Sequence, residues 1–244
     1  MAQAIKRYQV PVEQLILKNN GIKHQEFEIM LDCMQRHFEK VQVLTISHNR
    51  IGFKGANKLA MAFKEMKMLT HLDLSFDEIG DQGIETIAEQ LAASPFSLEE
   101  LDLSGNCLGK SPTSFQKVVP QVISMMANHS RLTSFKLSHN NMRGGHGGVD
   151  VLLKSFIEAS NLKHLDLSHN LLGKVYGPQN NKRPPPICVL SEVLIKANVL
   201  EYLNIARNEM DQQAALCIAQ GLSHTCTLKH IDVHGNPIGK FGMR

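Results

Sequence analysis

Leu72-Asp-Leu-Ser-Phe-Asp77-Glu-Ile79-Gly80 and Leu101-Asp-Leu-Ser-Gly-Asn106-Cys-Leu108-Gly109 are two copies of one phrase in this chain. The phrase has the form Leu-x-Leu-x-x-Asn-x-Ile-Gly, and variants of it return at intervals of roughly 30 residues. Its closing residue appears eight times, as Asn20, Asn49, Asp77, Asn106, Asn140, Asn170, Asn208 and Asn236. Self-similarity at this period predicts a stacked repeat architecture rather than a conventional globular core.

The repeat predicts one short strand and one helix per copy. In Leu-x-Leu, alternate side chains of a strand point the same way, so the leucines enter the core and the central x residue faces out. Between phrases, the apolar residues of segments 83–93 and 212–222 follow the i, i+3, i+4, i+7 spacing of an amphipathic helix. These residues are Ile84, Ile87, Ala88 and Leu91, and then Ala215, Ile218, Ala219 and Leu222.

These eight copies resemble the leucine-rich repeat family, and the Gly after Asn-x-Ile is similar to its ribonuclease-inhibitor-like subclass. The resemblance implies an α/β solenoid of about eight repeats, shaped as a horseshoe arc with a concave parallel β-sheet and convex helices. It covers nearly all of residues 1–244, which we therefore expect to be a single repeat domain. Neither end shows a distinct polar cap, and a solenoid needs its ends protected. We therefore expect the chain to be a segment of a longer protein, or its exposed end to be covered by a partner or another copy.

The closing Asn of each phrase is expected to turn inward and bond main-chain groups of adjacent loops that would otherwise be buried unpaired. Asp77 replaces Asn in the third copy. An ionised carboxylate accepts hydrogen bonds but cannot donate them, so this turn is expected to be locally weaker.

Two intervals between repeats are longer than the others. In the first, over 111–130, Pro112 suits a helix start and Pro120 is expected to kink or divide the helix. The second contains an inserted loop at about 174–186, whose Gly, Asn and Pro content favours a projecting segment. Such insertions either bind partners or are simply solvated. The residues of the possible docking loop are Tyr176, Lys182, Arg183, Pro184, Pro185 and Pro186.

Composition narrows the class of protein. The net charge is +3, and no apolar run approaches the roughly 20 residues of a membrane span. The polar start lacks the hydrophobic stretch of a signal peptide, which favours a cytoplasmic location, with a nuclear one as the alternative. The five cysteines are scattered and contain no Cys-x-x-Cys, so we expect reduced thiols, mainly in or near the core, with no metal site and no cofactor.

The outward positions of the strands define three rows on the concave face. The central row is Ile16, Thr45, Asp73, Asp102, Lys136, Asp166, Asn204 and Asp232. On one side lie Gln14, Val43, His71, Glu100, Ser134, His164, Tyr202 and His230. On the other side lie Lys18, Ser47, Ser75, Ser104, Ser138, Ser168, Ala206 and His234.

Asp73, Glu100 and Asp102 should form a negative patch that favours a protein partner with a basic surface. Alternatively, Leu-Asp-Leu-Ser is a common sequence of this family, and its polar side chains simply keep the exposed face of the sheet in contact with water. Tyr202, near Asn204 and Arg207, is the best single anchor, because aromatic and Arg side chains dominate interface energies. The predicted partner-binding residues are Asp73, Glu100, Asp102, Lys136, Asp166, Tyr202, Asn204, Arg207 and Asp232.

The position directly before the closing residue carries a ring in four of the repeats. His48, His139 and His169 occupy the same place in their repeats, and His139 and His169 could approach closely, although two imidazoles without a third ligand are weak evidence for metal. Phe76 stands at this place in the third repeat, either as a rim contact or folded onto the core.

The favoured function is a non-enzymatic protein–protein interaction module or scaffold. The alternative is a GTPase activator resembling the Ran activator, with Arg50, Arg143 or Arg207 aiding phosphoryl transfer in trans. No nucleic-acid role is expected, since the positive charge is small and no basic stripe with interleaved aromatics is present. The oligomeric state is left open by these patterns.

Overall fold

The computed structural model describes residues 12–144, 148–175 and 184–239. Its main sheet has eight parallel strands in the order β1-β2-β3-β4-β5-β7-β9-β10. The strands are β1 (Gln14–Ile16), β2 (Val43–Thr45), β3 (His71–Asp73), β4 (Glu100–Asp102), β5 (Ser134–Lys136), β7 (His164–Asp166), β9 (Tyr202–Asn204) and β10 (His230–Asp232). Each strand contains the first leucine position of one copy of the phrase, which confirms the eight repeats and the parallel sheet.

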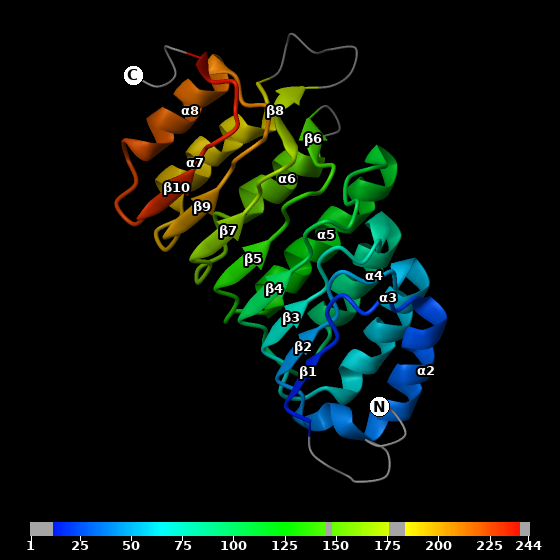
Figure 1. Ribbon diagram of the computed structural model, residues 1–244. Helices are drawn as coiled ribbons and strands as arrows, with labels where there is room; N and C mark the ends of the chain where they lie inside the picture. Colours follow the sequence, from blue (N-terminus) through cyan, green and yellow to red (C-terminus); the bar gives the residue numbers. More distant parts are fainter. Residues whose placement is uncertain (1–11, 145–147, 176–183, 240–244) are drawn as a thin grey trace.

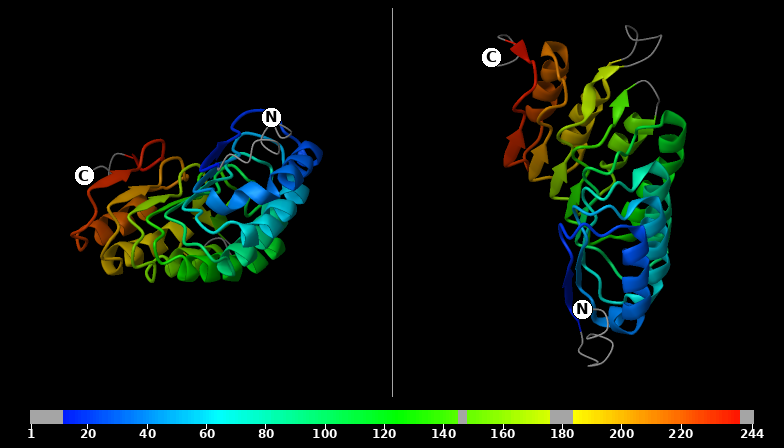
Figure 2. Two further views of the ribbon diagram at one scale, coloured as in Figure 1. Left: turned by 90° about the horizontal axis from the view of Figure 1, so that it is seen from below. Right: turned by 45° about the vertical axis from the view of Figure 1, so that its right-hand side comes forward.

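Seven helices connect these strands, and they lie side by side along one face of the sheet (Figure 1). They are α2 (His24–Met34), α3 (Gly52–Ala62), α4 (Gly80–Ala92), α5 (Pro112–Asn128), α6 (Gly148–Ser155), α7 (Val189–Lys196) and α8 (Gln212–Leu222). Short 3-10 segments are η1 (Gln35–Lys40), η2 (Phe63–Glu65) and η3 (Pro186–Cys188). Figure 2 shows the resulting arc, with the strands on its inner side and the helices outside. None of these helices is both long and apolar enough to span a bilayer.

The core lies between the sheet and the helices. The strand leucines stack in register, with Leu44 opposite Leu72 and Leu72 opposite Leu101. In α4 the four predicted apolar residues are all buried. In α8 Ala215 and Ile218 are buried as predicted, but Ala219 is exposed. The buried face of α8 runs instead through Ala214, Ala215, Ile218 and Gly221, so that prediction was wrong at one residue.

The closing asparagines form a continuous ladder, as predicted. Asn49 is representative: its Oδ1 accepts from the backbone N–H groups of Asn20 and Ile22 at 3.0 Å each, and its Nδ2 donates to the Leu17 carbonyl at 2.9 Å. Each asparagine therefore ties its own turn to the turn of the preceding repeat, where the loop backbone has no strand partner.

Asp77 interrupts this ladder, because its carboxyl group lacks the amide donor of Asn and accepts from one backbone N–H where Asn49 accepts from two. Its Oδ1 accepts from the Asn49 N–H at 2.8 Å, while its fully buried Oδ2 has no hydrogen-bond partner. Burial raises the pKa of Asp77 to about 8, with the hydrogen bond from Asn49 opposing the rise and the nearby charge of Asp73 adding to it. The side chain is therefore largely protonated at neutral pH, which changes the expectation based on an ionised carboxylate.

The two long repeats are accommodated in different ways. The first is absorbed by α5, which starts at Pro112 as predicted, with the Ser111 side chain accepting from the Ser114 N–H. The helix continues through Pro120, so of the two predicted outcomes, a kink or a division, the division does not occur. Pro120 is exposed, where a missing amide hydrogen bond is tolerated.

The second long repeat builds a small parallel sheet from β6 (Arg143–Gly144) and β8 (Leu171–Val175). This sheet was not predicted. Among the possible docking residues, Tyr176, Lys182 and Arg183 lie outside the described residues. Pro184 is exposed and Pro185 is half-buried, but Pro186 is buried against Gly144 and is not available as an exposed contact.

Candidate functional site

The central row runs across the concave face as predicted. Strand register places Asp73 beside Asp102, Asp102 beside Lys136, and Lys136 beside Asp166. The row continues from Asp166 to Asn204 and Asp232. Glu100 and Tyr202 lie in the neighbouring row, and Arg207 lies in the turn that follows β9.

The third row is not the exposed surface that the sequence predicted. Its members from the second to the seventh repeat are buried, namely Ser47, Ser75, Ser104, Ser138, Ser168 and Ala206. These residues lie beyond the strands, where the backbone turns toward the closing asparagine. The small side chains allow this turn to pack closely, so the accessible face is narrower than three rows.

The acidic residues of the central row also have a structural role. Oδ1 of Asp73 accepts from the Ser75 N–H and Oδ1 of Asp102 from the Ser104 N–H, both at 2.9 Å. The same bond recurs at Asp166, Asn204 and Asp232. It explains part of the Leu-Asp-Leu-Ser phrasing: one carboxylate oxygen closes a local turn, and the other is left for other contacts.

The concave face carries an acidic hollow, which we define by Asp73, Glu100 and Asp102 with the flanking His71 and Lys136. Its volume is about 230 Å³, and it lies over β2, β3, β4 and β5. Three carboxylates face one lysine, whose Nζ is 3.7 Å from Asp102 Oδ2. His71 Nε2 is 3.6 Å from Glu100 Oε1. The hollow therefore keeps an excess of negative charge.

Asp102 is more enclosed than Glu100, with 20% of its side chain exposed against 53%. Desolvation raises its pKa, and the charge of Asp73 raises it further, against the opposing effects of Ser104 hydrogen bonds and Lys136. A cation entering the hollow would stabilise the ionised form, because it would replace the solvation that burial removed.

A row of rings runs along the rim of the concave face. We call His48, Phe76, His139 and His169 the rim ladder. His48 stacks on Phe76 with ring centroids 4.6 Å apart, Phe76 lies 5.4 Å from His139, and His139 stacks on His169 at 3.8 Å. Phe76 is half-buried, so of the two alternatives it is the rim contact.

His139 and His169 are thus as close as the sequence predicted, but they stack nearly parallel, at 16°. Ring nitrogen lone pairs lie in the plane of the ring, so stacked imidazoles do not converge on one ion. No group of three potential metal ligands occurs within the described ranges.

Tyr202 is held between two imidazoles. The centroid of its ring is 5.8 Å from that of His164 and 4.9 Å from that of His230. The Tyr202 and His230 rings stack in parallel, with an interplanar angle of 1°. Both faces of the phenol are used by neighbours, which leaves its edge and hydroxyl for other contacts. Sequence analysis placed these three residues in one row but did not predict the stack.

The arginines proposed for phosphoryl transfer differ in their surroundings. Arg50 Nε is 3.5 Å from Glu78 Oε1 in an exposed ion pair. Arg143 lies in β6 with a buried Nε. Arg207 is exposed, and its Nε lies 3.5 Å from His234 Nε2.

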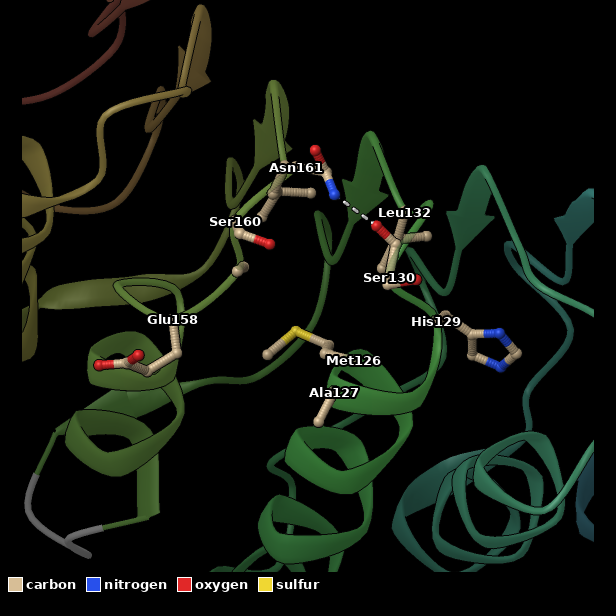
Figure 3. A pocket seen from close by; sticks show the side chains of 10 residues that line it. Met126, Ala127, His129, Ser130, Leu132, Glu158, Ser160 and Asn161 are labelled. Atoms are coloured by element: carbon tan, nitrogen blue, oxygen red, sulfur yellow. Dashed lines mark hydrogen bonds between the residues drawn. The ribbon is translucent and has the colours of Figure 1, made fainter.

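A second, smaller hollow of about 70 Å³ lies away from the concave face, between the loops that follow α5 and α6 (Figure 3). Asn161 bridges it by donating to the Ser130 carbonyl. The His129 ring points away from it, stacks on Phe96 at 5.9 Å and accepts from the Leu98 N–H. The hydrogen bond from Asn161 to Ser130 joins two neighbouring repeats across this hollow, and among the described residues that line it no cluster of charged side chains points into it.

The described cysteines are all free thiols. Cys33, Cys188 and Cys217 are partly buried, whereas Cys107 and Cys226 are exposed, which is more exposure than we expected from sequence.

Comparison with known proteins gives matches to leucine-rich repeat family models at residues 65–88, 97–118 and 161–189. The mouse protein NLRC5 is 26% identical over 241 residues, covering 90% of this chain and 12% of NLRC5. A solved structure of the TLR13–ssRNA13 complex is matched with a TM-score of 0.52 at 17% identity over 83% of this chain and 24% of that one. Yeast Rad7, solved with Elc1, is matched with a TM-score of 0.51 at 14% identity over 95% of this chain and 59% of the solved one.

These structural similarities show the fold alone. The chain spans less than two thirds of each of the three proteins.

Proposed function

Because this chain is a leucine-rich repeat protein, we propose that it is a non-enzymatic interaction module that binds a basic segment of a protein partner on its concave face. The acidic hollow would receive a Lys or Arg side chain of that segment. A preformed solenoid surface loses little conformational entropy on binding, which favours recognition without chemistry.

The observation that carries this proposal is the geometry of the hollow. Asp73 and Asp102 sit on adjacent strands and use Oδ1 for the backbone, so both direct their remaining charge to one volume of about 230 Å³. A guanidinium or ammonium group placed there would relieve the repulsion between the two carboxylates. Tyr202, Asp166, Asn204 and Asp232 extend the contact surface along the sheet.

A protein partner is favoured over a nucleic acid. The solved relatives include one protein complex, with Elc1, and one RNA complex, with ssRNA13. In this chain the carboxylates of the hollow would repel a phosphate backbone, and binding of nucleic acid needs a cationic surface.

The GTPase-activator alternative stays a prediction without added support. Activation in trans requires an exposed arginine that can enter another active site. Arg50 is exposed but paired with Glu78, and Arg207 is exposed with His234 as its hydrogen-bond partner. We further propose the ribonuclease-inhibitor-like subclass, on the basis of one helix per strand, and a cytoplasmic or nuclear setting. The exposed Pro184 keeps the inserted loop as a secondary docking candidate.

The test is quantitative capture of partners from cell extract with Asp73→Asn/Asp102→Asn. Asn keeps the Oδ1 acceptor, as Asn204 shows in the same row, so the variant removes charge without breaking the turn. Asp32→Asn, at an exposed position of α2 outside the concave face, is the matched control for loss of an acidic charge. Circular dichroism confirms the fold of each.

We expect partners with basic segments to be lost from the double variant and kept by the control. Their binding should also weaken as pH falls, beginning at a higher pH than for an ordinary aspartate, because burial raises the pKa of Asp102. Identical partners for all three proteins would reject the acidic hollow as the site.

A further inference from the structure

Arg207 holds a fixed position at the C-terminal part of the rim. It precedes the closing Asn208, with a positive φ of 52°. Its stem covers Gly235 of the next repeat: a Cβ atom at Gly235 would lie 2.7 Å from Arg207 Cγ. The stem is therefore packed while the side chain stays exposed, so the guanidinium is presented at reduced entropic cost.

The charge of this guanidinium is not neutralised. Its hydrogen bond is to a histidine, His234, and it makes no ion pair with any described carboxylate. Arg50 and Arg131, in contrast, are paired with Glu78 and Glu99. The terminal nitrogens of Arg207 are thus available for a two-pronged contact with an oxyanion.

His234 explains why the nearby Asp232 does not neutralise the charge of Arg207. Asp232 Oδ1 accepts from the His234 N–H at 3.0 Å and lies 2.8 Å from His234 Nδ1. With the proton on Nδ1, Nε2 accepts from Arg207, and this hydrogen-bond pattern assigns the tautomer. The negative charge of Asp232 is used within its own turn, and His234 positions Arg207.

His169 lies on the other side of Arg207, at the end of the rim ladder. Its pKa is lowered, first by burial and then by His139, Arg207 and His234, while Asp166 acts in the opposite direction. A neutral His169 leaves the guanidinium without a like charge beside it at neutral pH. An anion bound here would offset the repulsion from Arg207 and favour protonation of His169.

We propose that Arg207, flanked by His169 and His234, is a binding site for a carboxylate group of a protein partner. This inference rests on the proposed interaction function and gives the concave face a second site of opposite polarity. A planar carboxylate matches the guanidinium fork, while His234 holds Arg207 in place through the hydrogen bond from Arg207 Nε to His234 Nε2.

The position of the site relative to the acidic hollow defines the partner further. Strand order places β9 three steps from β4, which corresponds to about 14 Å at ~4.8 Å per step. A single partner contacting both sites would carry a basic and an acidic side chain at about that spacing, close to four residues of extended chain at ~3.3 Å each.

The experiment is an NMR titration of the whole chain with the peptide Ac-Gly-Glu-Gly-Glu-Gly-NH2, matched by its Gln counterpart. Histidine ring and arginine Nε–H signals report on the site. The variant is Arg207→Gln, which keeps the Cγ atom over Gly235 and removes the charge. Arg50→Gln, a paired arginine, is the control.

We expect the Glu peptide to shift the His169 and His234 signals saturably, with about tenfold weaker affinity in Arg207→Gln and no change in the control. Affinity should rise as pH falls below the ordinary range of a histidine pKa, because the pKa of His169 is lowered and its proton is gained only there. Equal affinity for the Gln peptide, or unchanged binding by Arg207→Gln, would overturn the proposal. A phosphoserine peptide that binds more than tenfold tighter than the Glu peptide would overturn the choice of carboxylate.

A further arm separates this site from the acidic hollow. Asp73→Asn/Asp102→Asn is expected to bind the Glu peptide as well as the wild type does. Failure of the hollow to hold a basic partner would leave this result unchanged, so the two proposals fail independently.

Discussion

The ring of Phe76 lies directly over Gly105 of the next repeat. A Cβ atom added to Gly105 would approach Phe76 Cε1 to 2.6 Å, and Gly105 has a φ of +67°. The fourth repeat thus provides no ring to the rim ladder, but its glycine lets Phe76 reach toward His139, 5.4 Å away. Arg207 covers Gly235 in the same manner at the C-terminal part of the rim.

Gly105→Ala should lower the free energy of unfolding by about 2 to 4 kcal/mol, through left-handed strain and overlap with Phe76. Chemical denaturation measures this. Gly80→Ala is the matched control, since Gly80 has a φ of +73° with open space around it, and should cost only about 1 to 2 kcal/mol. Equal losses in the two variants would show that Phe76 moves aside freely.

Asp77→Asn should stabilise the protein by about 1 to 3 kcal/mol near pH 8, because the amide supplies the missing donors of the ladder. The pKa of Asp77 is about 8 in the folded state, against an ordinary value of 3.8 for an exposed aspartate in the unfolded chain. Unfolding therefore releases a proton between these values, and wild-type stability should fall as pH rises from about 4 to about 8.

The comparison variant for Asp77 is Asn106→Asp, which places the same carboxylate in the next rung and should lower stability. Denaturant midpoints measured from pH 5 to pH 8.5 would show the gap between wild type and Asp77→Asn widening with pH. A constant gap would mean that Asp77 does not titrate in this range.

Pro120→Ala should raise the free energy of unfolding by about 1 to 3 kcal/mol, since an interior helical proline loses an amide hydrogen bond and is disfavoured by about 3 kcal/mol. The exposed position of Pro120 means that Ala removes little packing. Pro112→Ala, at the first turn of the same helix, should be neutral or slightly destabilising. Thermal unfolding of the two variants tests this contrast.

Asp166→Ala should cost about 1 kcal/mol, because the Ser168 N–H loses its acceptor at 2.9 Å. Asp166→Asn keeps that acceptor and should stay within a few tenths of a kcal/mol of wild type. If both variants were equally stable, the turn would not depend on this side chain, and the Leu-Asp-Leu-Ser phrasing would need another explanation.

Much of the fold could be predicted because the same pattern of apolar residues recurs in eight repeats. The Leu-x-Leu positions located every strand of the main sheet and the central row from Ile16 to Asp232. The sequence did not reveal that Ser75 and Ser104 are buried, because a polar residue two positions beyond an exposed aspartate has the same pattern whether the backbone continues straight or turns inward.

The candidate sites were predicted only in part. Asp73, Glu100 and Asp102 were grouped correctly because parallel register follows directly from repeat alignment. The contact of Arg207 with His234, the stacking on Tyr202 and the pairing of β6 with β8 depend on side-chain directions and loop paths, which no periodicity encodes.

By itself, the sequence determined the solenoid, its eight rungs and the order of residues along the concave face, because a strict repeat of apolar positions permits one stacked arrangement. The tertiary structure alone decided which of those residues are accessible and which charges are left uncompensated. Burial of the serine row, the enclosure of Asp102 and the unpaired charge of Arg207 arise from packing between neighbouring repeats, and that packing depends on three-dimensional distances that residue spacing does not contain.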